Sequence, residues 1–322
     1  MAIANATIAD VTTVVTKGTT PTTLGRHFTS HGIGFIKAEC ISGDGVLIIE
    51  KQVYIDEETD QLLKRSRLQK DDVLFSIAGV IGRTALVQQS ALPANTNQAI
   101  AILRPDPKKI VPRFLYYTVR ARGFQDHSLG RVVQTAQANV SLGVLSAAPI
   151  WLPPISAQRR IASILSSYDD LIENCQRRVQ ILEQMARALY REWFVKFRYP
   201  GHESVPLVSS PLGEIPQGWS VRRVGGVADV LRGRSYRSAD LVETGGLPFL
   251  NLKCLDRDGG FRRAGLKRYS GDFKPHHVAK KGDIVMAVTD MTQERRIVAR
   301  AALVPTLDND FGILSMDLVR IE

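Results

Sequence analysis

The chain has 322 residues, 44% of them hydrophobic and 23% charged. This length exceeds that of one typical domain and allows a substantial core, so two domains with a connector are expected. Lysine and arginine outnumber aspartate and glutamate by 42 to 32, which gives a formal charge of +10. That balance favours a polyanionic partner, with a basic surface kept for solubility as the alternative.

Two classes of protein are disfavoured by the same sequence. It contains no run of about 18 apolar residues, and its first residues, MAIANATIADVTT, lack the charged and apolar regions of a signal peptide. A cytoplasmic protein without membrane association is therefore expected. The three cysteines, Cys40, Cys175 and Cys254, show no C-x-x-C spacing, so neither a disulfide framework nor a zinc site is indicated.

Residues 1–152 are predicted to form a strand-rich first domain. Short apolar runs alternate with turn residues such as SGDG at 42–45. A helix is expected over 112–122, where apolar residues gather on one side. The predicted strands are 33–38, 46–49, 72–77, 84–87 and 99–103.

A single long helix is predicted within residues 153–200, over 156–197. This stretch contains no glycine or proline; Pro153-Pro154 precedes it, Ser156 is expected to cap it, and Pro200-Gly201 ends it. Its apolar residues recur at alternating steps of four and three, which is the a/d pattern of a coiled coil, over a length of roughly 60 Å. The predicted seam consists of Ile161, Leu165, Tyr168, Ile172, Cys175, Val179, Leu182, Ala186, Leu189 and Trp193.

Residues 201–211 are expected to form a polar linker, and residues 212–322 a second domain that repeats the first. Five segments recur in the same order, and the match includes the pair Cys40 and Cys254. The predicted fold class is therefore α/β (α+β), with two similar strand-rich domains joined by a long coiled-coil-forming helix. The matched segments are 8–11 with 227–230, 17–21 with 232–236, 32–41 with 246–256, 71–87 with 282–304, and 96–105 with 312–321.

The repeat leaves one part of the first copy unmatched. The second copy stops at Glu322, without the helices that follow residue 105 in the first copy. We expect either a truncated form or a partner that supplies the equivalent elements. A strict apolar seam also needs a cover, so the helix is expected to pair with another copy, to bind a partner subunit, or to leave an apolar stripe exposed.

No catalytic or metal-binding constellation is predicted. A G-x-x-x-x-G-K-[ST] loop and an H-E-x-x-H motif are both missing from the sequence. His27 and His31 are four residues apart, but in a stretch that is expected to be a solvated loop. LPPI at 152–155 is best explained as punctuation before the long helix. No catalytic residue, metal or cofactor is therefore assigned to this chain.

The loops of both repeats carry side chains suited to DNA. Lysine and arginine neutralise phosphates, and forked or amide side chains bind base edges; ordinary solvated loops are the alternative explanation. In the first domain the candidates are Lys17, Thr19, Thr20, Arg26, Lys37, Arg65, Arg67, Arg83, Asn97 and Gln98. In the second they are Arg232, Arg234, Tyr236, Arg237, Lys253, Thr289, Asp290, Thr292, Gln293, Arg295 and Arg296.

The segment LPP-x-x-x-QRRIA, continued by ALYREWF and LGEIPQGW, closely resembles the central conserved region of type I restriction–modification specificity subunits. The resemblance covers nearly the whole chain. It implies a subunit without catalytic activity, whose two target-recognition domains each bind one half of a split DNA sequence while the conserved helices set the spacer. Family members normally carry a second conserved helix at the C-terminus, and this chain lacks it.

The resemblance also implies partners. The conserved helices of such subunits dock two adenine methyltransferase subunits that use S-adenosylmethionine. Through these they join restriction and translocation subunits that use ATP and magnesium. An aromatic cluster at the end of the helix is a candidate docking patch, although it could instead pack the helix end onto the flanking domains. Its residues are Tyr190, Trp193, Phe194, Phe197 and Tyr199.

The leading hypothesis is therefore a non-catalytic DNA-recognition subunit. A second hypothesis is a self-sufficient DNA-modifying enzyme with an unrecognised site, which predicts cleavage or methyl transfer by the purified chain alone. A third is a coiled-coil scaffold with two protein-binding domains, which predicts binding that does not weaken steeply with salt.

Overall fold

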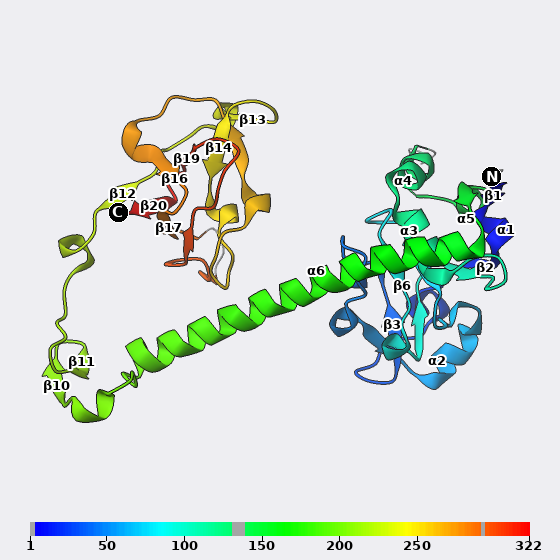
Figure 1. Ribbon diagram of the computed structural model, residues 1–322, viewed down its shortest axis with the longest axis horizontal. Helices are drawn as coiled ribbons and strands as arrows, with labels where there is room; N and C mark the ends of the chain where they lie inside the picture. Colours follow the sequence, from blue (N-terminus) through cyan, green and yellow to red (C-terminus); the bar gives the residue numbers. More distant parts are fainter. Residues whose placement is uncertain (1–3, 131–138, 291–293) are drawn as a thin grey trace. The chain divides into compact units, whose positions relative to one another are not determined.

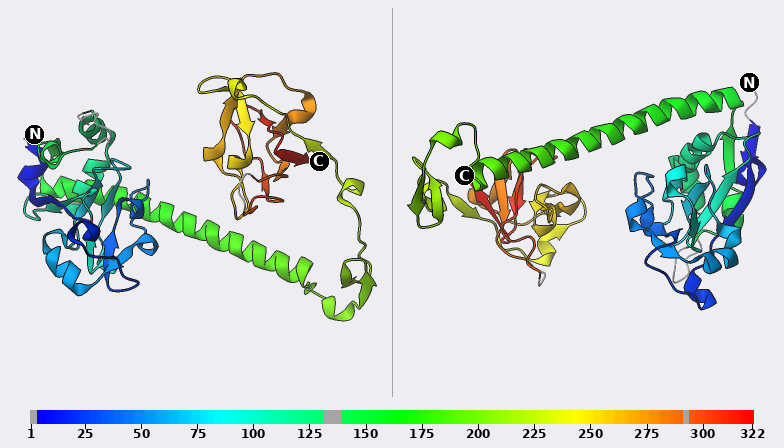
Figure 2. Two further views of the ribbon diagram at one scale, coloured as in Figure 1. Left: turned by 180° about the vertical axis from the view of Figure 1, so that it is seen from behind. Right: turned by 90° about the horizontal axis from the view of Figure 1, so that it is seen from below.

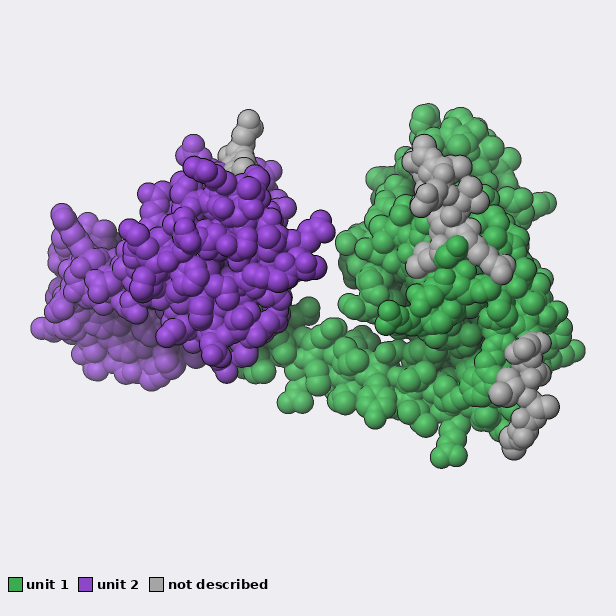
Figure 3. All heavy atoms as spheres, turned by 90° about the horizontal axis from the view of Figure 1, so that it is seen from above, with its two compact units in different colours: residues 1–187 green, residues 188–322 purple. Residues whose placement is uncertain are grey.

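The computed structural model describes residues 4–130, 139–290 and 294–322, and the chain divides into two compact units. Unit 1 is residues 1–187 and unit 2 is residues 188–322 (Figure 3). Both units are rich in strands, and one long helix extends from unit 1 (Figure 1). The mixed helix-and-strand fold class predicted from the sequence is confirmed. None of the described helices is long and apolar enough to cross a bilayer.

Unit 1 is built around two sheets. One sheet has the strand order β2-β8-β5-β6 and is antiparallel throughout; the other has the order β4-β3-β7, with β3 and β7 parallel. A separate pair, β1 and β9, ties the first strand to the segment before the long helix. The elements are β1 Ala4–Thr7, α1 Ile8–Val11, β2 Thr12–Lys17, β3 Ile33–Ile36, β4 Val53–Ile55, α2 Glu57–Leu62, β5 Val73–Ser76, β6 Thr84–Leu86, β7 Ala94–Thr96, β8 Ile100–Pro105, α3 Pro112–Arg120, α4 Arg122–Leu129, α5 Leu142–Ser146, β9 Pro149–Leu152 and α6 Ile155–Tyr190.

The core of unit 1 follows from the alternation of side chains along β5. Val73 and Phe75 point to the face covered by α3, where Phe114 and Leu115 are buried against them. Leu74 points to the opposite face and joins a second buried cluster. Both faces of the sheet are therefore covered, and β5 is buried along its whole length.

Four of the five predicted strands of this unit are present, and the prediction for 46–49 is wrong. Ser42–Gly45 makes a tight turn in which Gly45 has a φ of +85°. Only Leu47 then bridges back to Ile41. The predicted helix over 112–122 is α3, which stops at Arg120 because Ala121 is extended and α4 begins after it.

The long helix is α6, which runs without interruption for 36 residues, or roughly 54 Å (Figure 2). It begins one residue earlier than expected, and the Pro154 carbonyl accepts hydrogen bonds from the N–H groups of Ala157 and Gln158. Ser156 lies inside the first turn, so its predicted capping role is wrong. The predicted end at Phe197 is also wrong, because Arg191–Val195 forms a π-helical turn and Phe197 has a φ of +57°.

Unit 2 contains a hairpin and two larger sheets. The hairpin pairs β10 with β11, so part of the predicted linker 201–211 is strand. The larger sheets have the orders β12-β20-β17-β18 and β13-β15-β14-β19-β16. The elements are β10 Leu207–Ser210, β11 Gly213–Pro216, β12 Val230–Arg232, β13 Leu241–Val242, β14 Leu247–Leu250, β15 Lys267–Tyr269, β16 Val278–Lys280, β17 Ile284–Ala287, β18 Ala301–Leu303, β19 Phe311–Leu314 and β20 Leu318–Ile321.

The strand orders confirm the internal repeat. The order β2-β8-β5-β6 in unit 1 corresponds to β12-β20-β17-β18 in unit 2. Likewise β3 pairs antiparallel with β4 and parallel with β7, as β14 pairs with β15 and β19. Cys40 and Cys254 are both fully buried, and each Sγ accepts a backbone N–H from three residues earlier at 3.5 Å. Burial raises the pKa of both thiols, that of Cys254 to about 11.

Candidate nucleic-acid interface

In unit 1, three connections meet at one place. The Gly18 N–H donates to the Asn97 carbonyl at 3.1 Å, and the Thr20 N–H donates to Gln98 Oε1 at 3.0 Å. The Ile77 N–H donates to the Ala99 carbonyl at 2.8 Å, which adds the connection between β5 and β6. We call this meeting point of 17–21, 77–83 and 97–99 the unit 1 loop junction. It brings together Lys17, Thr19, Thr20, Asn97 and Gln98 of the predicted set.

Unit 2 has the equivalent loop junction, formed by 232–236, 288–290 with 294–300, and 315–317. The Arg234 N–H donates to the Leu314 carbonyl, and the Met316 N–H donates to the Arg234 carbonyl, both at 2.7 Å. The Val288 N–H donates to the Asp317 carbonyl at 3.0 Å, and Thr289 Oγ1 donates to Asp317 Oδ1 at 2.9 Å. Arg232, Arg234 and Thr289 of the predicted set therefore lie together.

A glycine at the same place in both units allows the loops to approach this closely. A Cβ at Gly18 would lie 1.7 Å from the Thr96 carbonyl oxygen, and one at Gly233 would lie 2.1 Å from the Ser315 carbonyl oxygen. Neither position can hold a side chain without moving the backbone.

We expect Gly18→Ala to lower the free energy of unfolding of unit 1 by about 1–3 kcal/mol, because the added methyl group overlaps a backbone oxygen. Gly43→Ala is the matched control, since a Cβ there meets open space, and it should change stability by less than about 0.5 kcal/mol. Hydrogen exchange of the β2 and β8 amides measures both variants. Equal protection in the two would contradict the expectation.

The connection after β17 is rich in polar residues. Asp290 Oδ2 accepts from the Ile297 N–H at 3.0 Å, and Arg296 lies 2.8 Å from Glu294. Arg295 is exposed and has a φ of +47°. Two further predicted residues of this connection, Thr292 and Gln293, lie outside the described residues.

Several predicted DNA-binding side chains of unit 1 have partners within the protein. Arg83 donates to the Ile41 carbonyl at 2.8 Å, and Arg67 Nε donates to Asp60 Oδ2 at 2.6 Å. Lys37 lies 4.6 Å from the centre of the Phe28 ring and 4.0 Å from Glu39. Arg26 pairs with Glu58 at 3.0 Å, whereas Arg65 is exposed. A role in DNA binding stays a prediction for each of them.

In unit 2, Tyr236 belongs to a buried cluster, because its ring packs edge-on against Phe249 at 4.7 Å. Arg234 Nε donates to the Tyr269 hydroxyl at 2.7 Å, which orients the guanidinium. Arg237 and Lys253 are exposed. Of these side chains, the two exposed cations have the freedom to reach a phosphate.

The apolar side of α6 is uncovered over most of its length. Residues 170–191 are all exposed, including Leu182 at 61%, whereas Ile161 is partly buried against unit 1. The stripe is wider than the predicted seam, because Ile164, Leu171 and Met185 are also exposed. Sequence analysis missed these three, although each stands one position before a seam residue. An apolar face of this width is typical of a helix in a bundle of more than two.

The predicted docking patch packs largely on itself and on Trp219 within unit 2. The Trp219 ring lies 6.1 Å from Phe194, 5.4 Å from Phe197 and 6.1 Å from Tyr199, which stacks on it. Phe194 also contacts Tyr190 and Trp193. These contacts match the alternative explanation, in which the cluster secures the end of the helix. A docking role stays a prediction.

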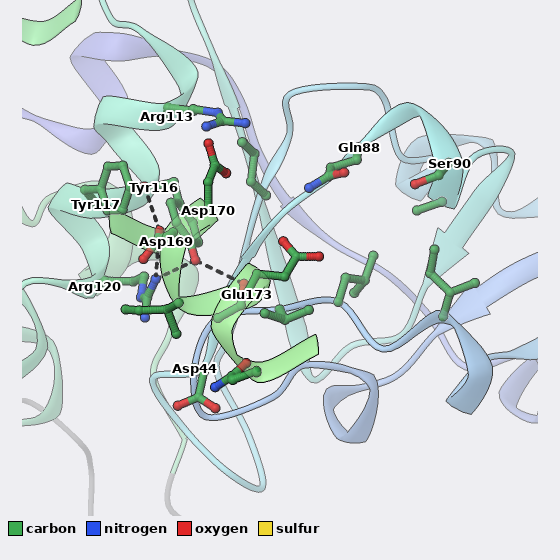
Figure 4. Close-up of a pocket in the computed structure, with 18 residues that line it drawn as sticks. Asp44, Gln88, Ser90, Arg113, Tyr116, Tyr117, Arg120, Asp169, Asp170 and Glu173 are labelled. Carbon is green, nitrogen blue, oxygen red and sulfur yellow. Dashed lines mark hydrogen bonds and ion pairs between the residues drawn. The ribbon is translucent and has the colours of Figure 1, made fainter. Parts of the chain in front are cut away.

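A cleft of about 550 Å³ lies in unit 1 between α6, α3 and residues 44–49 (Figure 4). Sequence analysis missed it, because its walls come from distant segments. At one end Tyr117 Oη donates to Asp169 Oδ2 at 2.6 Å, with Arg120 3.9 Å from the same oxygen. Burial and this hydrogen bond raise the pKa of Tyr117, so its hydroxyl remains a donor. No group of three or more acidic, histidine or cysteine side chains suited to a metal occurs in the described parts of the chain.

Comparison with known proteins places the chain in a family. The type I restriction modification DNA specificity domain matches residues 4–184, more than half of the chain. The MjaIX specificity subunit of Methanocaldococcus jannaschii is 25% identical over 79% of this chain and 60% of its own length. The putative MjaX specificity subunit of the same organism is 28% identical over 69% of this chain and 53% of its own length. The chain thus spans little more than half the length of these relatives.

Among solved structures, the HsdS subunit from Thermoanaerobacter tengcongensis aligns with 99% of this chain and 75% of its own length. The sequence identity is 18% and the TM-score is 0.43. The family assignment depends instead on the match over residues 4–184, which includes nearly all of unit 1, with most of α6. The chain belongs to the family of the type I restriction modification DNA specificity domain.

Proposed function

We propose that this chain is a DNA sequence-specificity subunit of a type I restriction–modification enzyme and has no catalytic activity of its own. The observation that carries the proposal is the repeated loop junction. The two units have the same strand order and a glycine at the equivalent position of the loop junction. They carry different polar side chains around that junction. A shared scaffold with different loops suits recognition of two different half-sites.

In this proposal each unit binds one half of a bipartite target, and α6 sets the spacer. The basic side chains contact phosphates, while threonine, asparagine and glutamine at the junctions contact base edges. A helix of roughly 54 Å is longer than one turn of DNA, which is about 34 Å. The two half-sites can then lie in successive grooves.

The uncovered stripe of α6 is the proposed docking surface for partner subunits. We infer that two adenine methyltransferase subunits bind there, bringing S-adenosylmethionine, and that restriction subunits using ATP and magnesium join through them. The width of the stripe supports a bundle of several helices. A second copy of α6 is the alternative cover, and sedimentation of the purified chain tests for it.

Selection from randomised duplexes, with the cognate methyltransferase subunit present, tests the proposed function. We expect a bipartite motif whose second half changes when residues 212–322 are exchanged for those of a relative. Binding should weaken by about 10³-fold or more between 50 and 200 mM salt if six or more phosphates are contacted.

Each competing hypothesis has its own outcome. A single continuous motif would contradict the proposal, and so would a bipartite motif that stays the same when residues 212–322 are exchanged. Cleavage or methyl transfer by the purified chain alone would favour the self-sufficient enzyme. Binding that is insensitive to salt would favour the protein scaffold.

A further inference from the structure

The first attachment of α6 to unit 1 is in its first turn. Gln158 is 1% exposed, and its Oε1 accepts the Val111 N–H at 2.8 Å. Its Nε2 donates to the Lys109 carbonyl at 3.2 Å and to the Pro153 carbonyl at 2.8 Å. All three hydrogen-bond partners of the Gln158 side chain are backbone groups, so this end of the helix is held in place.

The second attachment is the hydrogen bond from Tyr117 to Asp169 (Figure 4). Asp169 follows Gln158 by 11 residues, which is about three helical turns, so both side chains leave the same side of α6. Tyr117 is on α3, whose neighbouring residues Phe114, Leu115 and Tyr116 are buried in the core of unit 1. The tyrosine is therefore a fixed point on the domain.

Beyond Asp169 the helix leaves the domain surface. Every residue from 170 to 191 is exposed, and the cleft opens between the domain and the side of α6 that carries Ile172, Glu173 and Gln176. Asp169 thus makes the last side-chain hydrogen bond between α6 and the rest of unit 1 among the described residues.

The Gln158 hydrogen bonds and the packing of Ile161 and Ala162 on the core hold only the first two turns of α6, so without a contact farther along, the helix can still tilt. Tyr190 is 32 residues beyond Gln158, or roughly 48 Å along the helix axis. A rotation of about 10° around the first attachment would move that end by about 8 Å, which is more than two base-pair steps of about 3.4 Å. A small change in helix direction at Asp169 therefore produces a large displacement at the far end of α6.

We propose that Asp169, held by Tyr117, is the positioning residue that sets the direction of α6 from unit 1 and thereby the spacer length between the two half-sites. The effect on spacer length rests on the function proposed above, whereas the effect on the direction of α6 is independent of that function. The two parts can therefore be tested separately.

Pulsed electron paramagnetic resonance tests the direction of the helix. One spin label is placed at Gln61→Cys on α2 and one at Gln184→Cys on α6, both exposed positions, in a Cys175→Ser background; Cys40 and Cys254 are buried. We expect Tyr117→Phe and Asp169→Ala each to broaden the distance distribution at least twofold. Asp170→Ala is the matched control, since this neighbouring carboxylate has no hydrogen bond or ion pair with the described residues, and it should leave the distribution unchanged.

Hydrogen exchange of α3 and β5 establishes that each variant retains the fold of unit 1. Equal distributions in the wild type, Tyr117→Phe and Asp169→Ala, with the fold retained, would overturn the proposal. Broadening in Asp170→Ala to the same extent would overturn it as well, because the effect would then not depend on the tyrosine contact.

Spacer selectivity is measured on the chain with its methyltransferase partner, using duplexes whose spacers differ by one base pair. Asp169→Ala should reduce the preference for the best spacer over its neighbours by about tenfold, while Asp170→Ala keeps it. A broadened distance distribution with unchanged spacer preference would overturn the proposal. If the wild type binds no bipartite DNA, the proposed function fails, and the resonance distances still decide whether Asp169 directs the helix.

Discussion

Asp72→Ala is expected to lower the free energy of unfolding of unit 1 by about 3–5 kcal/mol. The Asp72 side chain is fully buried and accepts two hydrogen bonds from Arg104, at 2.7 and 2.8 Å, and a third from the Gln69 N–H at 2.7 Å. Removing the carboxylate leaves a guanidinium that is only 22% exposed without its counter-charge. The loss should appear as increased hydrogen exchange throughout β5 and β8.

The internal repeat supplies the matched control. Asp283 occupies the equivalent position before β17 and accepts the Lys280 N–H at 2.8 Å, as Asp72 accepts that of Gln69. Its side chain is 30% exposed, and its ion pair with Arg320 is longer, at 3.6 Å. Arg320 also pairs with Glu322 at 3.1 Å, so its guanidinium keeps a counter-charge, and Asp283→Ala should cost only about 1 kcal/mol in unit 2. Equal losses from the two variants would show that burial of the pair is not the cause.

Leu182→Asp is expected to weaken the binding of the methyltransferase partner by at least roughly 30-fold, equivalent to about 2 kcal/mol. Leu182 is central in the stripe, and a carboxylate there would have to be buried without a partner when the stripe is covered. The fold of the free chain should not change, since the leucine is 61% exposed. Titration of the methyltransferase subunit by calorimetry measures the effect.

Gln184→Asp is the control for this prediction. It introduces the same charge two residues later, on a part of α6 away from the stripe, and it should leave the affinity within about threefold. Identical losses in both variants would indicate a general effect of charge on the helix. An unaffected Leu182→Asp would show that partners bind elsewhere.

Much of the fold was predictable because its signals are local. The short apolar run within 72–77 is sufficient to predict β5, and a long stretch without glycine or proline is sufficient to predict α6. The repeat is visible in the sequence because both copies keep similar turns, an equivalent cysteine and an equivalent glycine within the loop junction. Predictions were wrong where local backbone conformation sets the limits of an element, as at the start of α6 near Ser156 and after the turn that precedes Val46.

The contacts that position the site were not predictable, because they join residues far apart in the sequence. Tyr117 and Asp169 are separated by 52 residues, and nothing near either one specifies the other. The loop position of Tyr236 predicts a DNA contact, yet its ring packs on Phe249. The charge of Arg67 and Arg83 predicts phosphate contacts, but their partners within the protein, Asp60 and the Ile41 carbonyl, are distant in sequence.

The uncovered stripe of α6 also has a consequence for the life of the protein in a cell. Contiguous exposed apolar surface is what chaperones and proteases engage, and a chain without a bound partner would be drawn toward aggregation or degradation. Binding of a partner removes that surface and stabilises the chain by mass action. The abundance of this protein should therefore follow the supply of whatever covers α6, so that synthesis in excess of the partner does not accumulate.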